Sequence, residues 1–151
     1  MKKEKDFYQV SLKVFLKNNK GEVLILKGIN SGTFAGFYDL PGGRINTDEF
    51  KVDFNEILKR EIKEEVGKVN FHINSNKPVA FGRHLIPASF SDEGREKRVL
   101  YLFFEAEFSD GNVIISDEHT DHKWVNLKEI DQKQYFKSGI LEGVKMYLES
   151  R

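Results

Sequence analysis

The sequence lacks cysteine, which excludes disulfide bonds, thiolate metal sites and thiol nucleophiles. It has only three prolines in 151 residues and no low-complexity tract, which is typical of an ordered globular chain. It also lacks an apolar run of the roughly 20 residues that a membrane-spanning helix needs, so no membrane partner is expected. The basic start, residues 1–5, is followed by alternating apolar and polar residues, which argues against an export signal. The cytoplasm is therefore the expected location.

A net charge is lacking too, because 24 basic residues balance 24 acidic ones. No global field favours the binding of duplex nucleic acid, whereas a small phosphorylated ligand needs only local positive charge. The length suits one domain, and we expect a single domain over residues 1–151.

Alternating apolar residues over 10–17, turn residues over 18–21 and a β-rich run over 22–27 predict a hairpin. The segment 28–36 is predicted to be a loop, and Pro41-Gly42-Gly43 is expected to interrupt regular structure. Phe81 and Trp124 could stack on a base, but they are expected in the core, since they lie in β-rich runs. The other strands are predicted over 37–40, 69–73, 79–86, 98–108 and 123–126.

Two helices are expected. Asp53 and Glu56 have the spacing of a capping box, which predicts a helix from there to Val66, with Gly67 in the left-handed conformation that ends helices. Apolar residues at helical spacing predict a closing amphipathic helix over 139–149. Helices mixed with strands predict an α+β fold.

Three carboxylates gather on one side of the first predicted helix. Glu61, Glu64 and Glu65 stand at positions i, i+3 and i+4, and two of them border the face expected to be buried. Partly buried carboxylates that repel each other are costly unless a cation neutralises them, and Mg²⁺ prefers such oxygen ligands. The alternative is a solvated acidic helix that is balanced by neighbouring lysine and arginine residues.

The surrounding residues resemble the Nudix box, whose pattern is Gly, five residues, Glu, seven residues, then Arg-Glu-aliphatic-any-Glu-Glu-any-Gly-aliphatic. Gly43 is followed at that spacing by Glu49, and residues 60–67 match the second half. The chain departs from the pattern in two ways: ten residues separate Glu49 from Arg60, an insertion of three, and Lys68 takes the last aliphatic position. We expect the insertion to lengthen the loop before the helix.

The resemblance implies a Nudix-type α/β/α sandwich with a mixed β-sheet. It also implies a Nudix-type pyrophosphohydrolase in which water attacks a phosphorus atom of a substrate diphosphate, with Mg²⁺, or Mn²⁺ as the alternative, as cofactor. Its metal ligands would be Glu61, Glu64 and Glu65, and Glu61 would also be a candidate base. Glu118, six residues before Trp124, resembles the acidic loop residue of the family and is the rival base or an extra ligand.

Other site residues have two interpretations each. Arg60 would orient the catalytic carboxylates, reaching Glu56 or Glu64, or form only a surface pair. Gly42 and Gly43 would bring backbone close to a metal or phosphate, or only form a turn after Pro41. The remaining candidates for substrate phosphates are Arg44, which follows these glycines, and two arginines that could equally face solvent, Arg83 and Arg98.

The leading hypothesis is a hydrolase of nucleoside triphosphates or nucleoside diphosphate derivatives. The alternative is a catalytically silent Nudix-like module that senses nucleotides or binds proteins, and the three retained helix glutamates favour the enzyme. His119 and His122 are expected at the surface rather than on a metal, because the chain has no cysteine and several carboxylates lie beside them. The exact substrate, the base and the number of metal ions stay open, and a homodimer is compatible with the sequence.

Overall fold

The computed structural model describes residues 2–151, which form eight strands, three α-helices and two short 3₁₀ helices. The α-helices are α1 (Phe54–Val66), α2 (Gln132–Tyr135) and α3 (Ser138–Glu149), and the 3₁₀ helices are η1 (Thr47–Glu49) and η2 (Ala88–Phe90). The strands are β1 (Gln9–Lys17), β2 (Val23–Gly28), β3 (Tyr38–Asp39), β4 (Gly42–Arg44), β5 (Asn70–Ile73), β6 (Ala80–Ile86), β7 (Lys97–Asp110) and β8 (His119–Val125).

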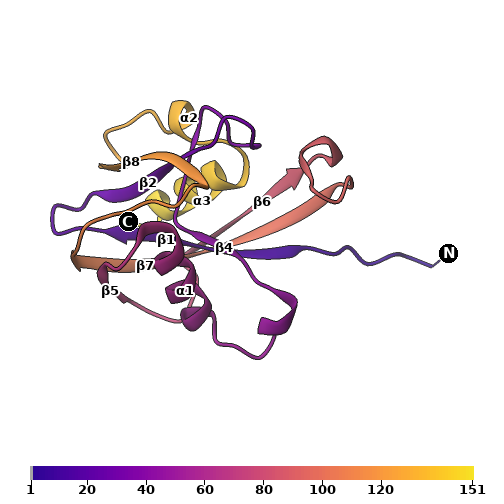
Figure 1. The fold of residues 1–151 in the computed structure, drawn as a ribbon, viewed down its shortest axis with the longest axis horizontal. Helices are drawn as coiled ribbons and strands as arrows, with labels where there is room; N and C mark the ends of the chain where they lie inside the picture. Colours follow the sequence, from indigo (N-terminus) through magenta and orange to yellow (C-terminus); the bar gives the residue numbers. More distant parts are fainter. Residues whose placement is uncertain (1) are drawn as a thin grey trace.

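The long strands β1 and β7 form the middle of the sheet. They pair in parallel from Gln9 opposite Val99 to Lys17 opposite Glu107, while all other pairings are antiparallel. On the side of β1 away from β7, β4 pairs near the start of β1 and β2 near its end. On the side of β7 away from β1, β6 pairs with the first half of β7 and β5 with the second half. The mixed sheet therefore opens between β4 and β2 (Figure 1).

The two longer helices cover opposite faces of this sheet (Figure 1). On one face, Ile57, Leu58 and Ile62 of α1 pack with every second residue of β1, starting at Leu12. On the other face, residues of α3 such as Val144 pack in a core cluster with Phe15 of β1. Because side chains alternate between the two faces of β1, this strand contributes residues to both apolar cores. The expected α+β sandwich with a mixed sheet is confirmed.

Helix α1 has the predicted bounds but not the predicted cap. Asp53 holds the N-cap position in an extended conformation, yet its side chain makes no capping hydrogen bond, so that part of the prediction is wrong. The helix ends as expected, because Gly67 adopts a φ of 87° and its N–H donates to the carbonyl of Lys63. A positive φ is open to glycine at little steric cost.

The Pro41-Gly42-Gly43 segment interrupts regular structure only in part: Pro41 lies in a bend between β3 and β4, but the two glycines do not. Residues 42–44 form β4, which pairs with residues 11–13 of β1. Gly42 has a φ of 141°, and a Cβ on it would lie 1.8 Å from the carbonyl oxygen of Leu12. Only glycine fits this approach, so what looks like a turn in sequence is a strand made by tertiary pairing.

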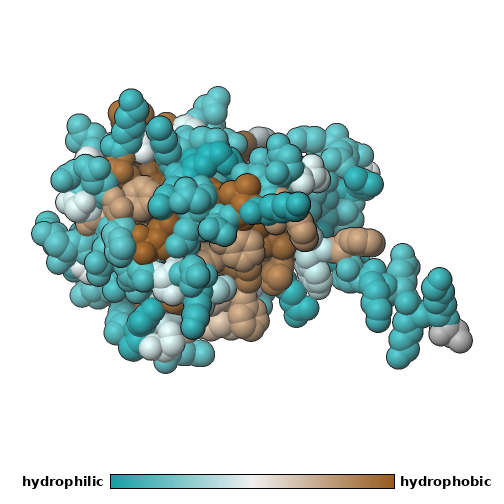
Figure 2. All heavy atoms as spheres, turned by 90° about the horizontal axis from the view of Figure 1, so that it is seen from below, coloured by the Kyte–Doolittle hydropathy of each residue, from teal (hydrophilic) through white to brown (hydrophobic). Residues whose placement is uncertain are grey.

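One face of β6 is less covered than expected. Gly82 packs against Gly139 of α3, whereas Phe81 points the other way and is 57% exposed, so its predicted place in the core is wrong. Trp124 is partly buried and packs with Phe108. Figure 2 shows apolar surface in the middle of the face seen from below.

Across residues 2–151, no helix combines the length and the apolar composition needed to cross a membrane.

Candidate active site

A cavity of about 740 Å³ lies beside the opening of the sheet. One of its walls is α1 and another is β4. The segment before β8 also lines it and lies beside the end of α1, where the N–H of Ser116 donates to the carbonyl of Glu65 at 3.1 Å. The cavity collects most of the residues singled out in the sequence: Arg60, Glu61, Glu64 and Glu65 from α1, Gly42, Gly43 and Arg44 from β4, and the exposed Glu118.

Arg83 and Arg98, the other predicted phosphate-binding residues, do not line this cavity. Arg83 is exposed on β6, at a position alternating with His84, which does line it. Arg98 pairs with Asp6 at 2.9 Å and with Glu96 at 3.3 Å near the N-terminal segment. The two arginines lie outside because they are on the opposite face of the β6–β7 hairpin from the cavity-lining His84.

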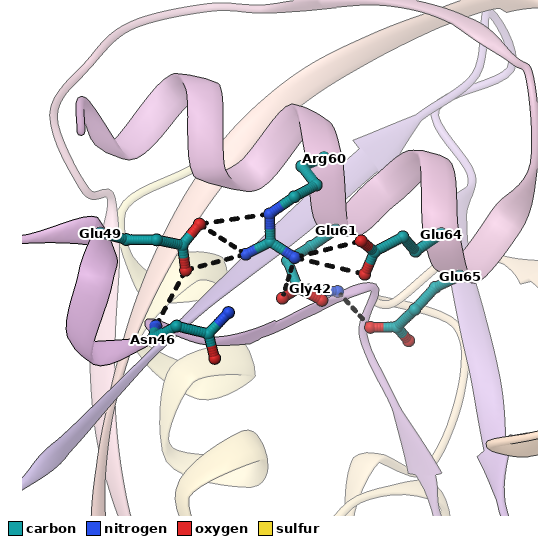
Figure 3. A network of polar contacts seen from close by, with 7 residues as sticks. All are labelled: Gly42, Asn46, Glu49, Arg60, Glu61, Glu64 and Glu65. Atoms are coloured by element: carbon teal, nitrogen blue, oxygen red, sulfur yellow. Dashed lines mark hydrogen bonds and ion pairs between the residues drawn. The ribbon is translucent and has the colours of Figure 1, made fainter.

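Arg60 joins three of the carboxylates (Figure 3). Its guanidinium contacts Glu49 at 2.8 Å, Glu61 at 3.1 Å and Glu64 at 3.2 Å. Burial works to lower the pKa of Arg60, but these carboxylates outweigh it and raise the pKa. The expected reach to Glu64 is therefore present, whereas Glu56 pairs with Lys59 instead. Arg60 holds the acidic side chains in fixed positions.

The insertion in the Nudix-like box does not displace Glu49. The 3₁₀ helix η1 carries Glu49, and its carboxylate accepts a hydrogen bond from the backbone N–H of Asn46 at 2.8 Å. That hydrogen bond and the contacts with Arg60 outweigh desolvation and lower the pKa of Glu49. The loop between η1 and α1 spans residues 50–53, and α1 begins at Phe54.

Glu65 is the most buried of the helix carboxylates, with a relative exposure of 3%. Its Oε1 accepts from the N–H of Gly42 at 3.1 Å, whereas its Oε2 is buried without a hydrogen-bond partner among the described residues. The Nδ1 atom of His119 lies 3.4 Å from that oxygen and also has no hydrogen-bond partner there. Burial is the main reason that the pKa of Glu65 is raised to about 8.

Glu61 lies against Gly43. A Cβ on Gly43 would lie 2.3 Å from Oε2 of Glu61, so glycine is needed here for the carboxylate to reach the backbone. Burial raises the pKa of Glu61, while Arg60 acts in the opposite direction. The group that approaches Gly43 is thus a carboxylate of the chain itself, and the predicted approach of these glycines to a metal or phosphate stays a prediction.

The donor set fits a hard divalent cation. Within residues 2–151 no three acidic or histidine side chains already form a metal-binding group, and Arg60 contacts both Glu61 and Glu64. However, the unpartnered buried oxygen of Glu65 lines the same cavity as these two carboxylates. A cation there would compensate the burial of negative charge, and carboxylate oxygens are the ligands that Mg²⁺ and Mn²⁺ accept.

Several cavity residues escaped the sequence analysis. Lys13 and Asp39 form a buried ion pair of 3.0 Å, with side chains 8% and 13% exposed. Lys13 alternates with apolar residues and so looked solvent-facing. One signal that this face of β1 is buried was missed: Phe15 is apolar and lies on the same face of the strand as Lys13. His119 was expected at the surface, but its side chain is only 9% exposed because it packs beside Glu65.

Comparison with known proteins finds a NUDIX domain family model that matches residues 7–143. The nucleoside triphosphatase NudI of Salmonella heidelberg strain SL476 is 30% identical over 118 residues, which cover 76% of this chain and 80% of that protein. The MutT protein from Methanosarcina mazei Go1 has a TM-score of 0.70 at 24% identity, covering 94% of this chain and 91% of that one. The E. coli dihydroneopterin triphosphate pyrophosphohydrolase has a TM-score of 0.65 at 15% identity, covering 97% and 100%. These two structural likenesses establish a shared fold.

Proposed function

This chain belongs to the Nudix hydrolase family, and from that premise we propose that it cleaves a diphosphate linkage in a nucleoside triphosphate or a nucleoside diphosphate derivative. The observation that carries the proposal is the buried Oε2 of Glu65, which has no hydrogen-bond partner within residues 2–151, in a cavity that also holds Glu61 and Glu64. A diphosphate needs its charge neutralised before water can attack phosphorus. Carboxylates arranged to hold a cation serve that purpose.

In this proposal Glu61, Glu64 and Glu65 hold one or more Mg²⁺ ions, with Mn²⁺ as the alternative. The bound cation supplies Lewis-acid neutralisation of the phosphate oxygens. Arg60 keeps the carboxylates in place through its contacts with Glu61 and Glu64. The proton of the attacking water passes to a carboxylate, for which Glu61 and Glu118 are the candidates in the cavity.

The nucleotide part of the proposal is supported by the similarity to the NudI proteins of Salmonella, which are nucleoside triphosphatases. Gly42, Gly43 and Arg44 line the acidic part of the cavity and are proposed to contact the substrate phosphates. The single domain over residues 1–151, the cytoplasmic location and the homodimer stay predictions.

A panel of nucleoside triphosphates, sugar nucleotides and dinucleoside polyphosphates, assayed for released phosphate groups, tests the function. We expect turnover of at least one class with Mg²⁺, loss of turnover with a chelator and recovery when Mg²⁺ or Mn²⁺ is added back. The control is the same panel incubated with metal and no protein. Absence of hydrolysis across the whole panel with either metal would contradict the proposal.

A further inference from the structure

The cavity has two chemically different ends. One end carries the carboxylates of α1, and the other is lined by Phe34, His84 and Tyr101. The rings of Phe34 and His84 have centroids 4.7 Å apart, and those of His84 and Tyr101 are stacked at 6.4 Å. Tyr101 is only 5% exposed, whereas Phe34 and His84 are partly buried, so these two are the rings that a flat group such as a nucleobase can reach.

The aromatic end is also held in position. The two ring nitrogens of His84 lie 2.7 Å from the hydroxyl of Ser138 and 3.1 Å from that of Thr33. These contacts come from α3 and from the loop after β2, so they fix the ring from two sides. A ring held in this way loses little conformational freedom when a ligand stacks on it.

Lys13 lies between the two ends. Its Nζ is 5.8 Å from the centroid of the Tyr101 ring, and its charge also acts on Glu65 and Glu61. Burial alone would lower the pKa of Lys13, but Asp39, Glu65 and Glu61 outweigh it and raise the pKa. The Nζ of Lys13 lies 3.0 Å from Oδ2 of Asp39, which is the geometry of an ammonium paired with a carboxylate.

The ammonium group of Lys13 has one more N–H donor than it uses in hydrogen bonds with the described residues. It donates to Oδ2 of Asp39 at 3.0 Å and to the carbonyl of Leu40 at 3.3 Å. An ammonium has three N–H donors, and within the described residues no third acceptor is found for it. Since Lys13 lines the cavity, a ligand there can take the third hydrogen bond.

The other cations of the cavity wall near the carboxylates are committed elsewhere or exposed. Arg60 is bound to Glu49, Glu61 and Glu64. Arg44 is exposed and donates to Gln9 at 2.8 Å. Lys13 is also paired, with Asp39 at 3.0 Å, but it keeps a free N–H donor and is buried, and a buried charge is screened less by water and salt than an exposed one.

We propose that Lys13 binds the phosphate group that is attached to the nucleoside. The substrate then lies with its base at the Phe34–His84–Tyr101 end and its scissile diphosphate at the carboxylate end. Asp39 acts as a positioning residue that aims the ammonium. The inference rests on the proposed function for the identity of the ligand, and it assigns the orientation of that ligand.

The test compares binding of the four ribonucleoside 5′-monophosphates with binding of the matching nucleosides, by NMR titration with Mg²⁺ present. Neither ligand is a substrate of the proposed reaction. The variants are Lys13→Met and the double variant Lys13→Met/Asp39→Asn, which avoids leaving an unpaired buried carboxylate. Lys17→Met is the matched control, because Lys17 lies on the same strand, pairs with Glu105 and does not line the cavity.

We expect both Lys13 variants to bind the monophosphates about 10- to 100-fold more weakly, the usual effect of a charged hydrogen bond. Their nucleoside binding should stay near that of the wild type, and Lys17→Met should change neither. The proposal is overturned if the Lys13 variants bind monophosphates and nucleosides equally more weakly, or if their monophosphate binding is not weakened. It is also overturned if the wild type binds no monophosphate. Monophosphate binding without any hydrolysis would instead contradict only the proposed function.

Discussion

Replacing Glu65 by Gln is expected to reduce kcat/KM by about 100- to 10,000-fold, since losing an anionic metal ligand removes several kcal/mol of transition-state stabilisation. Gln keeps the size of the side chain and can still accept from the N–H of Gly42, which Glu65 contacts at 3.1 Å. The fold should therefore survive while the cation loses a charged ligand. Glu64→Gln is expected to reduce activity as well, and both losses should persist at saturating Mg²⁺.

The matched control is Glu56→Gln on the same helix. Glu56 is exposed, pairs only with Lys59 and does not line the cavity. Its substitution should leave kcat/KM near the wild-type value, because exposed ion pairs of this kind are worth less than about 1 kcal/mol. Equal activity of the Glu65→Gln variant and the wild type, with thermal stability unchanged, would mean that α1 does not supply the metal site.

The second large effect is a pH-dependent stability of the metal-free protein. Burial raises the pKa of Glu65 from an ordinary 4.5 to about 8. Below pH 4.5 this carboxyl is protonated in both the folded and the unfolded chain. Between 4.5 and 8 the unfolded chain releases the proton and the folded chain keeps it, so the free energy of unfolding falls by up to about 1.4 kcal/mol per pH unit.

Urea unfolding of the wild type and Glu65→Gln, measured from pH 5.5 to 8.5 with a chelator, checks this effect. Titrating groups far from Glu65 contribute equally in both proteins, so the difference between their unfolding free energies reports Glu65 together with the groups that it contacts, such as His119 at 3.4 Å. The wild type should lose stability relative to the variant as the pH rises, and Mg²⁺ should restore more of it at pH 8 than at pH 5.5. Parallel profiles for the two proteins would contradict the account.

The parts of the fold set by local signals were predictable. The apolar stripe of α1 and the glycine after Val66 are enough to place that helix, because they act within a few residues. Strand β4 was not predictable, since it exists only by pairing with β1, and Pro41 and two glycines resemble a turn in isolation. The failed cap at Asp53 has the same origin, because a favourable spacing does not ensure the side-chain hydrogen bond.

The candidate site was predictable where one helix carries it. Glu61, Glu64 and Glu65 follow from helical spacing and from the resemblance to the family box. Lys13 and His119 could not be placed at the site without knowing which strands meet. Lys13 is distant in sequence from the glutamates on which its charge acts, and His119 is distant from Glu65, which its side chain approaches. The arginines outside the cavity show the same limit, because charge alone does not say which face of a hairpin a residue occupies.

The claim that the carboxylates of α1 hold a divalent cation is tested most directly by titrating the protein with Mn²⁺ and measuring free Mn²⁺ by electron paramagnetic resonance. We expect the wild type and Glu56→Gln to bind Mn²⁺ alike, Mg²⁺ to compete for the site, and Glu65→Gln to bind it far more weakly. Mn²⁺ binding of equal strength in Glu65→Gln and the wild type would contradict the account.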